Sequence, residues 1–295
     1  MLKTEHIQKI VAPYIIGNEA IKKLIFLQLF TMPNQGEKIN VLLIGDTASG
    51  KSDLAQETTK LCYNSAFMSR GASEAGLIGI ATRYGLQGGI LKEVDNGLLV
   101  IDELDKTDSN LRKSIIQLMD CYELRVAKFG WTQTIQANCN LICTANPRGN
   151  NWLSTRPTID EVPFNPVLLN RFHIVAPFKS LKPEEYDKLV KSFMQRNDKK
   201  KLDEFRSKVA DFVAEARDKY PEIKVPEPVL REAVNYVKKL KANYSNKIQH
   251  ISPRQIHGML ALLQASARMS FRDTVNMDDY KHISQLYTEI INLWL

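Results

Sequence analysis

The sequence predicts an α/β fold, in which helices flank a mostly parallel β-sheet, followed by an all-helical C-terminal region. Short apolar runs suited to buried parallel strands alternate with helical stretches; the runs are Val41–Ile44, Leu98–Ile101 and Asn140–Thr144. From Leu181 onward, apolar positions recur with the period of a helix instead. We therefore expect a sheet-containing domain over residues 1–178 and a helical domain over residues 179–295.

The first apolar run leads into a glycine-rich segment, GDTASGKS, which has the Walker A spacing. In this pattern the backbone N–H groups curl around phosphates at the positive N-terminus of the next helix, expected here over Ser52–Leu61. Lys51 would reach the β- and γ-phosphates and Ser52 would hold Mg²⁺. The sequence thus predicts ATP and Mg²⁺ as cofactors, bound by Gly45, Asp46, Thr47, Ala48, Ser49, Gly50, Lys51 and Ser52.

The second apolar run ends in two carboxylates, Asp102 and Glu103, which form a Walker B pattern. Asp102 is placed to complete the Mg²⁺ shell with Ser52, and Glu103 to polarise the water that attacks the γ-phosphate. Because this strand end follows a phosphate loop at a plausible βαβ interval, hydrolysis is favoured over nucleotide binding alone.

The third run ends in Asn146-Pro147. Asn146 is placed to sense the γ-phosphate or to align the water with Glu103; a turn-forming Asn-Pro is the alternative. Farther on, Phe164–Phe172 has the features of a capped helix, with Asn165 as the N-cap, Pro166 as the first helical residue and Arg171 at the far end. A surface arginine is ordinarily just solvated, but in an oligomer it can stabilise charge on a neighbour's γ-phosphate.

A β-hairpin is predicted over Leu124–Ile135, with Lys128 near its glycine-containing turn. An exposed lysine there can instead serve to blunt an edge strand. In the C-terminal region, Pro183–Tyr186 opens a helix and Asp198–Lys201 marks an exposed charged turn. Further helices are expected over Glu204–Tyr220, Glu227–Tyr244 and Pro253–Phe271, with Arg254 in the first turn of the last.

Composition gives weaker constraints. A net charge of +7 and a pI near 9.1 suit a polyanionic partner, although such a charge also serves solubility. The sequence has neither a membrane-spanning apolar window nor a secretory signal, so we expect no membrane association and a cytoplasmic (nucleoid) or nuclear location. The cysteines form no CxxC pair, and buried thiols are favoured over a metal site or a disulfide; they are Cys62, Cys121, Cys139 and Cys143.

In order and rough spacing, the Walker A segment, IDELDK, TANP and LLNRF resemble the motifs of AAA+ ATPases. Other strings resemble the minichromosome maintenance (MCM) replicative helicases in particular. These are IVAPYIIGNEAIKKLIFLQLF, NVLLIGD, GASEAGL at Gly71–Leu77, VAKFG at Val126–Gly130 and SPRQI at Ser252–Ile256. The resemblance covers most of the chain and implies an AAA+ P-loop sheet with a helical lid.

The resemblance also implies roles for single residues. Lys51, Ser52, Asp102, Glu103 and Asn146 would act from one subunit of a homo-oligomeric, hexamer-like ring. Arg171 and Arg254 would be offered to the neighbour's nucleotide; the alternative for Arg254 is a solvated arginine at a helix start. Lys128 would lie on a hairpin that projects into the channel of the ring and would grip single-stranded DNA.

The sequence departs from the family pattern in three places. Gly50 precedes the Walker lysine where a small residue such as alanine is usual, the insert between about Leu77 and Leu91 looks short, and His173 replaces an aspartate. A reduced channel-facing loop is therefore expected. The chain also begins close to the AAA+ region, without the zinc-binding N-terminal part of the family, so no zinc site is expected.

Three hypotheses follow. The first is an ATP-hydrolysing ring motor that translocates along or unwinds DNA, which Lys128 and the basic charge favour. The second is a helix-2-insert AAA+ protein of the MoxR or magnesium-chelatase kind, which remodels a protein and is favoured by the short insert. The third is a regulatory helicase subunit that is nearly inactive alone.

Overall fold

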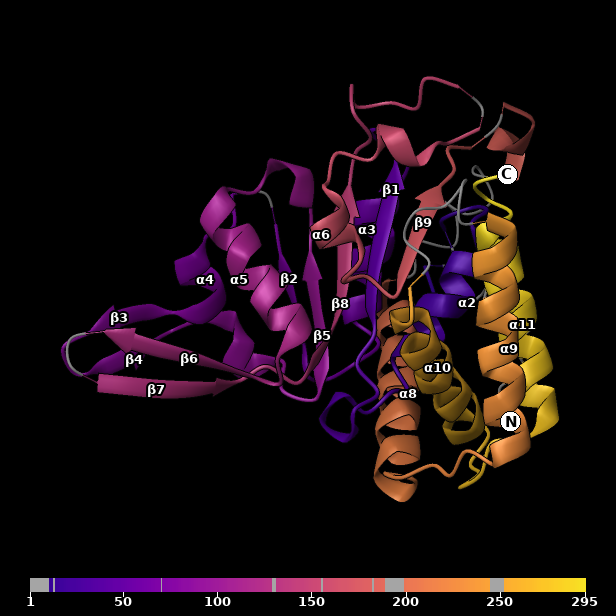
Figure 1. Ribbon diagram of the computed structural model, residues 1–295. Helices are drawn as coiled ribbons and strands as arrows, with labels where there is room; N and C mark the ends of the chain where they lie inside the picture. The colour runs from indigo at the N-terminus through magenta and orange to yellow at the C-terminus, as the bar shows by residue number, and fades with distance from the viewer. Residues whose placement is uncertain are drawn as a thin grey trace.

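A five-stranded parallel sheet forms the centre of the computed structural model, with strand order β2-β5-β8-β1-β9 (Figure 1). The structure describes residues 11–12, 14–69, 71–128, 131–154, 156–181, 183–188, 199–244 and 252–295. The strands are β1 (Asn40–Gly45), β2 (Ser65–Met68), β5 (Gly97–Ile101), β8 (Cys139–Ala145) and β9 (Ile174–Phe178). The predicted α/β fold and its three central strands are therefore confirmed.

The edge strands β2 and β9 were not predicted. β9 contains Pro177, which argues against a strand because proline cannot donate to the ladder. At the edge of the sheet one side of the strand has no neighbour, so the missing N–H leaves no partner unsatisfied. β2 has only four residues, which are too few for their alternating burial to stand out as a pattern in the sequence.

The sheet separates two apolar cores, because successive strand residues point to opposite faces. Val41 and Leu43 pack with α2 (Glu19–Gln28), α3 (Lys51–Thr59) and the C-terminal helices. Leu42 and Ile44 pack on the other face, against helices on the left of Figure 1. That face is covered by α4 (Glu74–Ile78), α5 (Ser109–Asp120) and α6 (Pro166–Leu169).

The C-terminal region is helical in its described parts, as predicted. Its helices are α8 (Lys199–Lys219), α9 (Glu227–Tyr244), α10 (Arg254–Met269) and α11 (Met277–Ile291). The turn predicted over Asp198–Lys201 is wrong for its lysines, which form the first turn of α8, since lysine is a good helix former; Asp198 lies outside the described residues. The division at residue 178 stays a prediction, and one apolar core includes residues from both sides of it.

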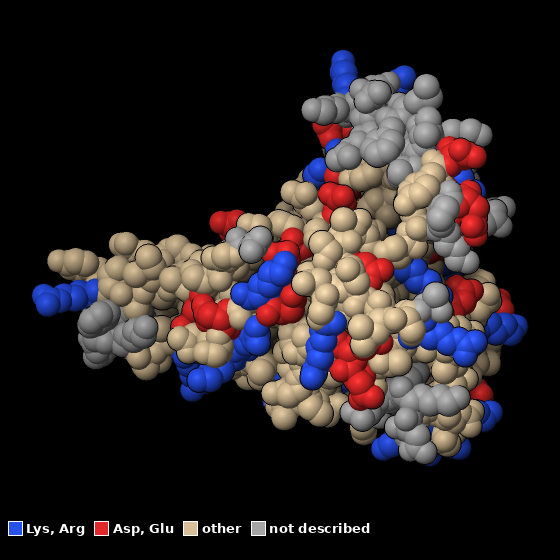
Figure 2. Space-filling view, turned by 90° about the horizontal axis from the view of Figure 1, so that it is seen from above, with Lys and Arg blue, Asp and Glu red and all other residues tan. Residues whose placement is uncertain are grey.

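An arm of two hairpins extends from the sheet (Figures 1 and 2). β6 (Glu123–Lys128) pairs antiparallel with β7 (Trp131–Gln136), which confirms the predicted hairpin and puts Lys128 opposite Trp131 next to its tip. Phe129 and Gly130 lie outside the described residues. The short insert forms a second hairpin beside it, β3 (Ile80–Thr82) and β4 (Gly85–Gln87).

Short 3-10 helices complete the described elements: η2 (Pro33–Gln35), η3 (Ile90–Glu93), η4 (Leu104–Lys106), η5 (Ile159–Glu161) and η6 (Pro183–Glu185). Among the described residues, no helix combines the length and the apolar character needed to cross a membrane. Cys62, Cys139 and Cys143 are buried free thiols, as predicted, and burial raises the pKa of Cys139 to about 12. Cys121 is only partly buried, because it follows the end of α5 at the surface.

Candidate functional site

The glycine-rich segment forms a loop between the end of β1 and the start of α3. Gly45 closes β1 where it touches β9, and a Cβ there would lie 2.4 Å from the Phe178 carbonyl oxygen. Gly50 has a φ of 91°, a left-handed conformation that favours glycine, and is the N-cap of α3. The loop therefore wraps the N-terminus of α3, which is the geometry of an anion-binding site.

Two segments from elsewhere in the chain hold this loop. The Asp46 carboxylate accepts hydrogen bonds from the backbone N–H of Trp152 at 2.7 Å and from the Ser180 hydroxyl at 2.9 Å. The Thr47 N–H donates to the Asn150 carbonyl oxygen at 3.1 Å. Asp46, which we expected to bind the cofactor, thus has a carboxylate engaged in fixing the loop.

Lys51 folds back over the loop, where its Nζ donates to the Asp46 carbonyl oxygen at 2.7 Å. Burial lowers the pKa of Lys51, while the nearby carboxylates of Asp102, Asp105 and Asp46 oppose that shift. The ammonium group is therefore held at the mouth of the loop among carboxylates. This is the position from which a lysine can reach the phosphates of a nucleotide.

Helix α3 and the strands β5 and β8 bring three oxygen-bearing side chains together beside Lys51. The Ser52 hydroxyl donates to Oδ1 of Asp102 at 2.7 Å, and the Thr144 hydroxyl donates to the same oxygen. Hydroxyl and carboxylate oxygens are the ligands that Mg²⁺ prefers, so Ser52 and Asp102 fit the predicted ion. The Ser49 hydroxyl is buried without a hydrogen-bond partner within the described part of the chain, as expected of a loop built for a polar ligand.

The sequence argument did not single out Thr144. Besides its bond to Asp102, its oxygen accepts the Glu103 N–H at 3.0 Å. Glu103 has a φ of 53°, unusual for a residue with a side chain, and its carboxylate pairs with Lys106 at 2.5 Å. Thr144 therefore fixes the backbone from which Glu103 projects. The signal in the sequence that could have identified Thr144 is its hydroxyl group near the end of the strand next to the Walker B strand.

Asn146 lies at the same edge of the sheet. It is buried, and its backbone N–H donates to Oδ1 of Asp105 at 3.2 Å. The carboxyl ends of three adjacent parallel strands thus gather the predicted residues Lys51, Ser52, Asp102, Glu103 and Asn146.

A cavity of about 470 Å³ adjoins the loop. Three segments form its walls: Tyr14, Ile15 and Ile16 from the N-terminal segment, Ala48, Ser49, Gly50 and Asp53 from the loop and α3, and Ser180, Leu181 and Tyr186 after β9. The apolar walls suit a flat base attached to phosphates held by the loop. This pocket could not be predicted from the sequence, since its walls come from three separate segments.

Arg171 and Arg254 do not join this cluster. The helix before Arg171 is capped as predicted, with the Asn165 side chain accepting the Leu168 N–H at 2.9 Å. Arg171 then lies at the amino edge of the sheet, where the side-chain amide of Asn40, the first residue of β1, donates to the Arg171 carbonyl oxygen at 3.2 Å. The length of β1, about 20 Å, separates this edge from the phosphate loop.

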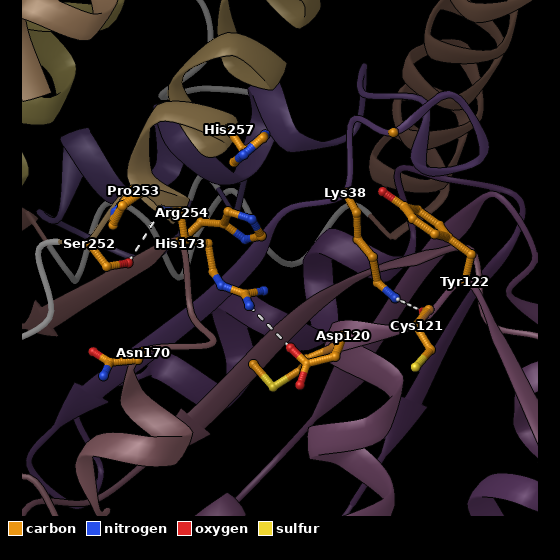
Figure 3. A pocket seen from close by; sticks show the side chains of 12 residues that line it. Lys38, Asp120, Cys121, Tyr122, Asn170, His173, Ser252, Pro253, Arg254 and His257 are labelled. Carbon is orange, nitrogen blue, oxygen red and sulfur yellow. Dashed lines mark hydrogen bonds and ion pairs between the residues drawn. The ribbon is translucent and has the colours of Figure 1, made fainter.

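The two arginines meet at Asp120, the last residue of α5. Nε of Arg171 lies 2.6 Å from Oδ2 of Asp120, and NH2 of Arg254 lies 3.1 Å from Oδ1 (Figure 3 shows the second pair). The structure therefore divides the predicted catalytic residues between opposite edges of the sheet.

His173, where the motif resemblance predicts an aspartate, is buried beside this arginine pair. Its Nδ1 accepts the Asn40 N–H at 2.9 Å. Gly258 of α10 packs on it so closely that a Cβ there would lie 2.9 Å from the His173 Cβ. Burial lowers the pKa of His173 to about 3, and the charges of Arg254, His257 and Lys38 act in the same direction. The imidazole is therefore neutral and brings the start of α10 close to the sheet.

This burial predicts a pH dependence of stability. Between pH 6.5 and about 3 the unfolded chain binds a proton at His173 that the folded chain does not, so stability falls as the pH falls. At pH 5 we expect a loss of about 2 kcal/mol from this residue. Urea unfolding at pH 7 and pH 5 measures it, with His173→Asn as the reference because asparagine keeps an acceptor without titrating. Equal losses in both proteins would contradict the prediction.

Comparison with known proteins identifies the family. The model of the MCM P-loop domain matches residues 2–197. The chain belongs to the MCM family. DNA replication licensing factor MCM4 of Drosophila melanogaster is 28% identical over 310 residues, which cover 97% of this chain and 36% of the relative. DNA replication licensing factor MCM2 of Oryza sativa subsp. indica is 27% identical over 319 residues, or 93% of this chain and 33% of the relative.

The resemblance drawn from the motifs is thus confirmed, as is the P-loop NTPase fold. This MCM chain spans about a third of the length of these curated relatives, 36% and 33%.

Proposed function

We propose that the chain is the ATPase part of an MCM ring motor, which hydrolyses ATP with Mg²⁺ and acts on DNA in replication. The observation that carries the proposal is the division of catalytic groups between opposite edges of one sheet. Walker residues gather at the carboxyl edge, and Arg171 and Arg254 meet at Asp120 on the amino edge. A complete site then needs two subunits, and such a head-to-tail contact forms a ring when the rotation between successive subunits closes.

Each residue has a role in this proposal. Lys51 binds the β- and γ-phosphates, while Ser52 and Asp102 hold Mg²⁺. Glu103 polarises the attacking water and Asn146 aligns it. Arg171 and Arg254 stabilise charge on the γ-phosphate of the neighbouring subunit in a homo-oligomeric, hexameric ring.

The arm supplies the contact with DNA in this proposal. Lys128 is the last residue of β6, next to the hairpin tip, and the arm extends beyond the body of the subunit (Figure 2). The chain carries a net charge of +7. One lysine per subunit around a channel would hold the backbone of single-stranded DNA without reading its sequence. Relatives named as replication licensing factors support a site of action on chromosomal DNA, in a nucleoid or a nucleus.

The ATPase rate, measured with and without single-stranded DNA over a range of protein concentrations, tests the proposal. We expect a rate that rises more than linearly with protein and rises further with DNA. Concentration-dependent hydrolysis that ignores DNA would support a MoxR-type protein remodeller instead. ATP binding without hydrolysis would support a regulatory subunit.

Lys128→Ala is expected to bring the ratio of the rates with and without DNA toward one. The slope of the logarithm of the DNA-binding constant against the logarithm of the salt concentration should become shallower by about one for each lysine–phosphate contact that is lost. Lys200→Ala removes an equal charge from an exposed position on α8 and should leave the ratio unchanged. Full DNA stimulation of the Lys128→Ala protein would contradict the role given to the hairpin.

A further inference from the structure

Asp120 joins two arginines that come from distant parts of the chain. One of its carboxylate oxygens accepts Nε of Arg171 at 2.6 Å, and the other accepts NH2 of Arg254 at 3.1 Å. We propose that Asp120 is a positioning residue, which holds both guanidinium groups together at the subunit face that a neighbour's nucleotide meets. The assignment rests on the proposed function, because it gives the arginines a partner in the next subunit.

The bond pattern shows why a carboxylate is needed here. NH1 of Arg171 also donates to the Val167 carbonyl oxygen at 2.6 Å, so its own helix already restrains this side chain. Arg254 lies at the start of α10, and the described bond of its guanidinium group goes to Asp120. Because both guanidinium groups bind the same carboxylate, their positive charges lie close together and repel each other. The negative charge of Asp120 between them offsets that repulsion. Asp120 is thus the described contact that ties Arg254 to Arg171.

The end of α5 is itself fixed. Nζ of the buried Lys38 donates to two backbone carbonyl oxygens at this helix end, those of Leu118 and of Cys121 at 3.0 Å (Figure 3 shows the bond to Cys121). It also donates to the Ala137 carbonyl oxygen after β7 at 2.9 Å. The first two bonds satisfy carbonyl groups that a helix end leaves unpaired. Asp120 therefore projects from a rigid base, as a residue that positions others must.

The surroundings of the pair leave it free to exchange partners. The side chains of Arg171, Arg254 and Asp120 are 24%, 32% and 31% exposed. A cavity of about 500 Å³ adjoins Asp120 and Arg254 and is lined among others by Lys38, His173 and His257 (Figure 3). The cations Lys38, Arg171 and Arg254 against the carboxylate of Asp120 give this face a net positive charge. A neighbour's phosphates would therefore replace part of the Asp120 contact without leaving the guanidinium groups unpaired.

Asp120→Asn tests the assignment, with Asp278→Asn as the matched control. The asparagine keeps the shape of the side chain at Asp120 and removes the charge that holds the two arginines. Asp278 lies on α11, forms an exposed pair with Lys281 at 3.1 Å and should tolerate the same loss of charge. We expect Asp120→Asn to lower the kcat of ATP hydrolysis roughly 5- to 50-fold with little change in KM, because the trans arginines act in the transition state.

Mixing of subunits separates positioning from a general defect. Asp120→Asn subunits should regain activity when mixed with Glu103→Gln subunits, which carry intact arginines, but not when mixed with Arg171→Ala subunits. Complementation of Arg171→Ala by Asp120→Asn would place Asp120 on the Walker side and overturn the assignment. Wild-type kcat in the Asp120→Asn protein would also overturn it while leaving the proposed function intact. A wild-type protein without ATPase activity would overturn both.

Discussion

Arg171→Ala is expected to lower the kcat of the assembled ATPase by roughly 10³-fold or more, the range typical of an arginine finger. The residue lies at the opposite end of β1 from its own phosphate loop, bonded to Asp120 and to the Val167 carbonyl oxygen. A loss of activity in a well-folded variant would therefore indicate the site of a neighbour, because its own phosphate loop lies about 20 Å away. Arg231→Ala, on the exposed face of α9, is the control and should keep wild-type activity.

A mixture of Arg171→Ala with Glu103→Gln subunits separates this explanation from misfolding. In the proposed ring, each variant alone lacks one half of every site. In a random 1:1 ring, about a quarter of the interfaces join an intact Walker edge to an intact arginine edge, so a rate near one quarter of wild type is expected if sites act independently. The measurement is ATPase activity against mixing ratio, with assembly of each variant confirmed by size. If two well-assembled variants recover no ATPase activity when mixed, the assignment of Arg171 to the neighbour's site is wrong.

The features that were predicted correctly are those that depend on residues close to one another in the sequence. The three central strands are continuous apolar runs, and the Walker segments follow two of them directly. The cap at Asn165 was visible because its partner lies three residues on. The strand β9 was missed because Pro177 argues against a strand wherever sheet order is unknown.

The candidate site was predicted in its parts but not in its arrangement. Sequence spacing cannot show that Arg171 and Arg254 share Asp120, since α5, α6 and α10 meet only after the chain folds. Thr144 was missed because its role depends on Asp102 in the adjacent strand. Buried cations such as Lys38 and Arg268 were invisible for the same reason: a lysine or arginine in a sequence is expected to be exposed until its partners are known.

Arg268 of α10 forms a fully buried ion pair with Glu37, which lies in the segment before β1. Its guanidinium group bonds both carboxylate oxygens, at 2.6 and 2.8 Å, and its side chain is 0% exposed. It also donates to the carbonyl oxygens of Phe30, Tyr220 and Pro221, at 2.7, 2.7 and 3.1 Å. One side chain thus ties α10, which begins with Arg254, to the N-terminal part of the sheet domain and to the end of α8.

Glu37→Gln is expected to destabilise the protein by about 3–5 kcal/mol, because it leaves a buried guanidinium group without its counter-charge. Urea unfolding followed by circular dichroism measures the loss. Glu227→Gln breaks the exposed pair with Arg231, in which the side chains are 70% and 74% exposed, and should cost less than about 1 kcal/mol. Equal losses in the two variants would mean that Glu37 does not hold α10. A Glu37→Gln protein that stays folded should also lose ATPase activity, since in the proposed ring the start of α10 carries Arg254 to the neighbour's site.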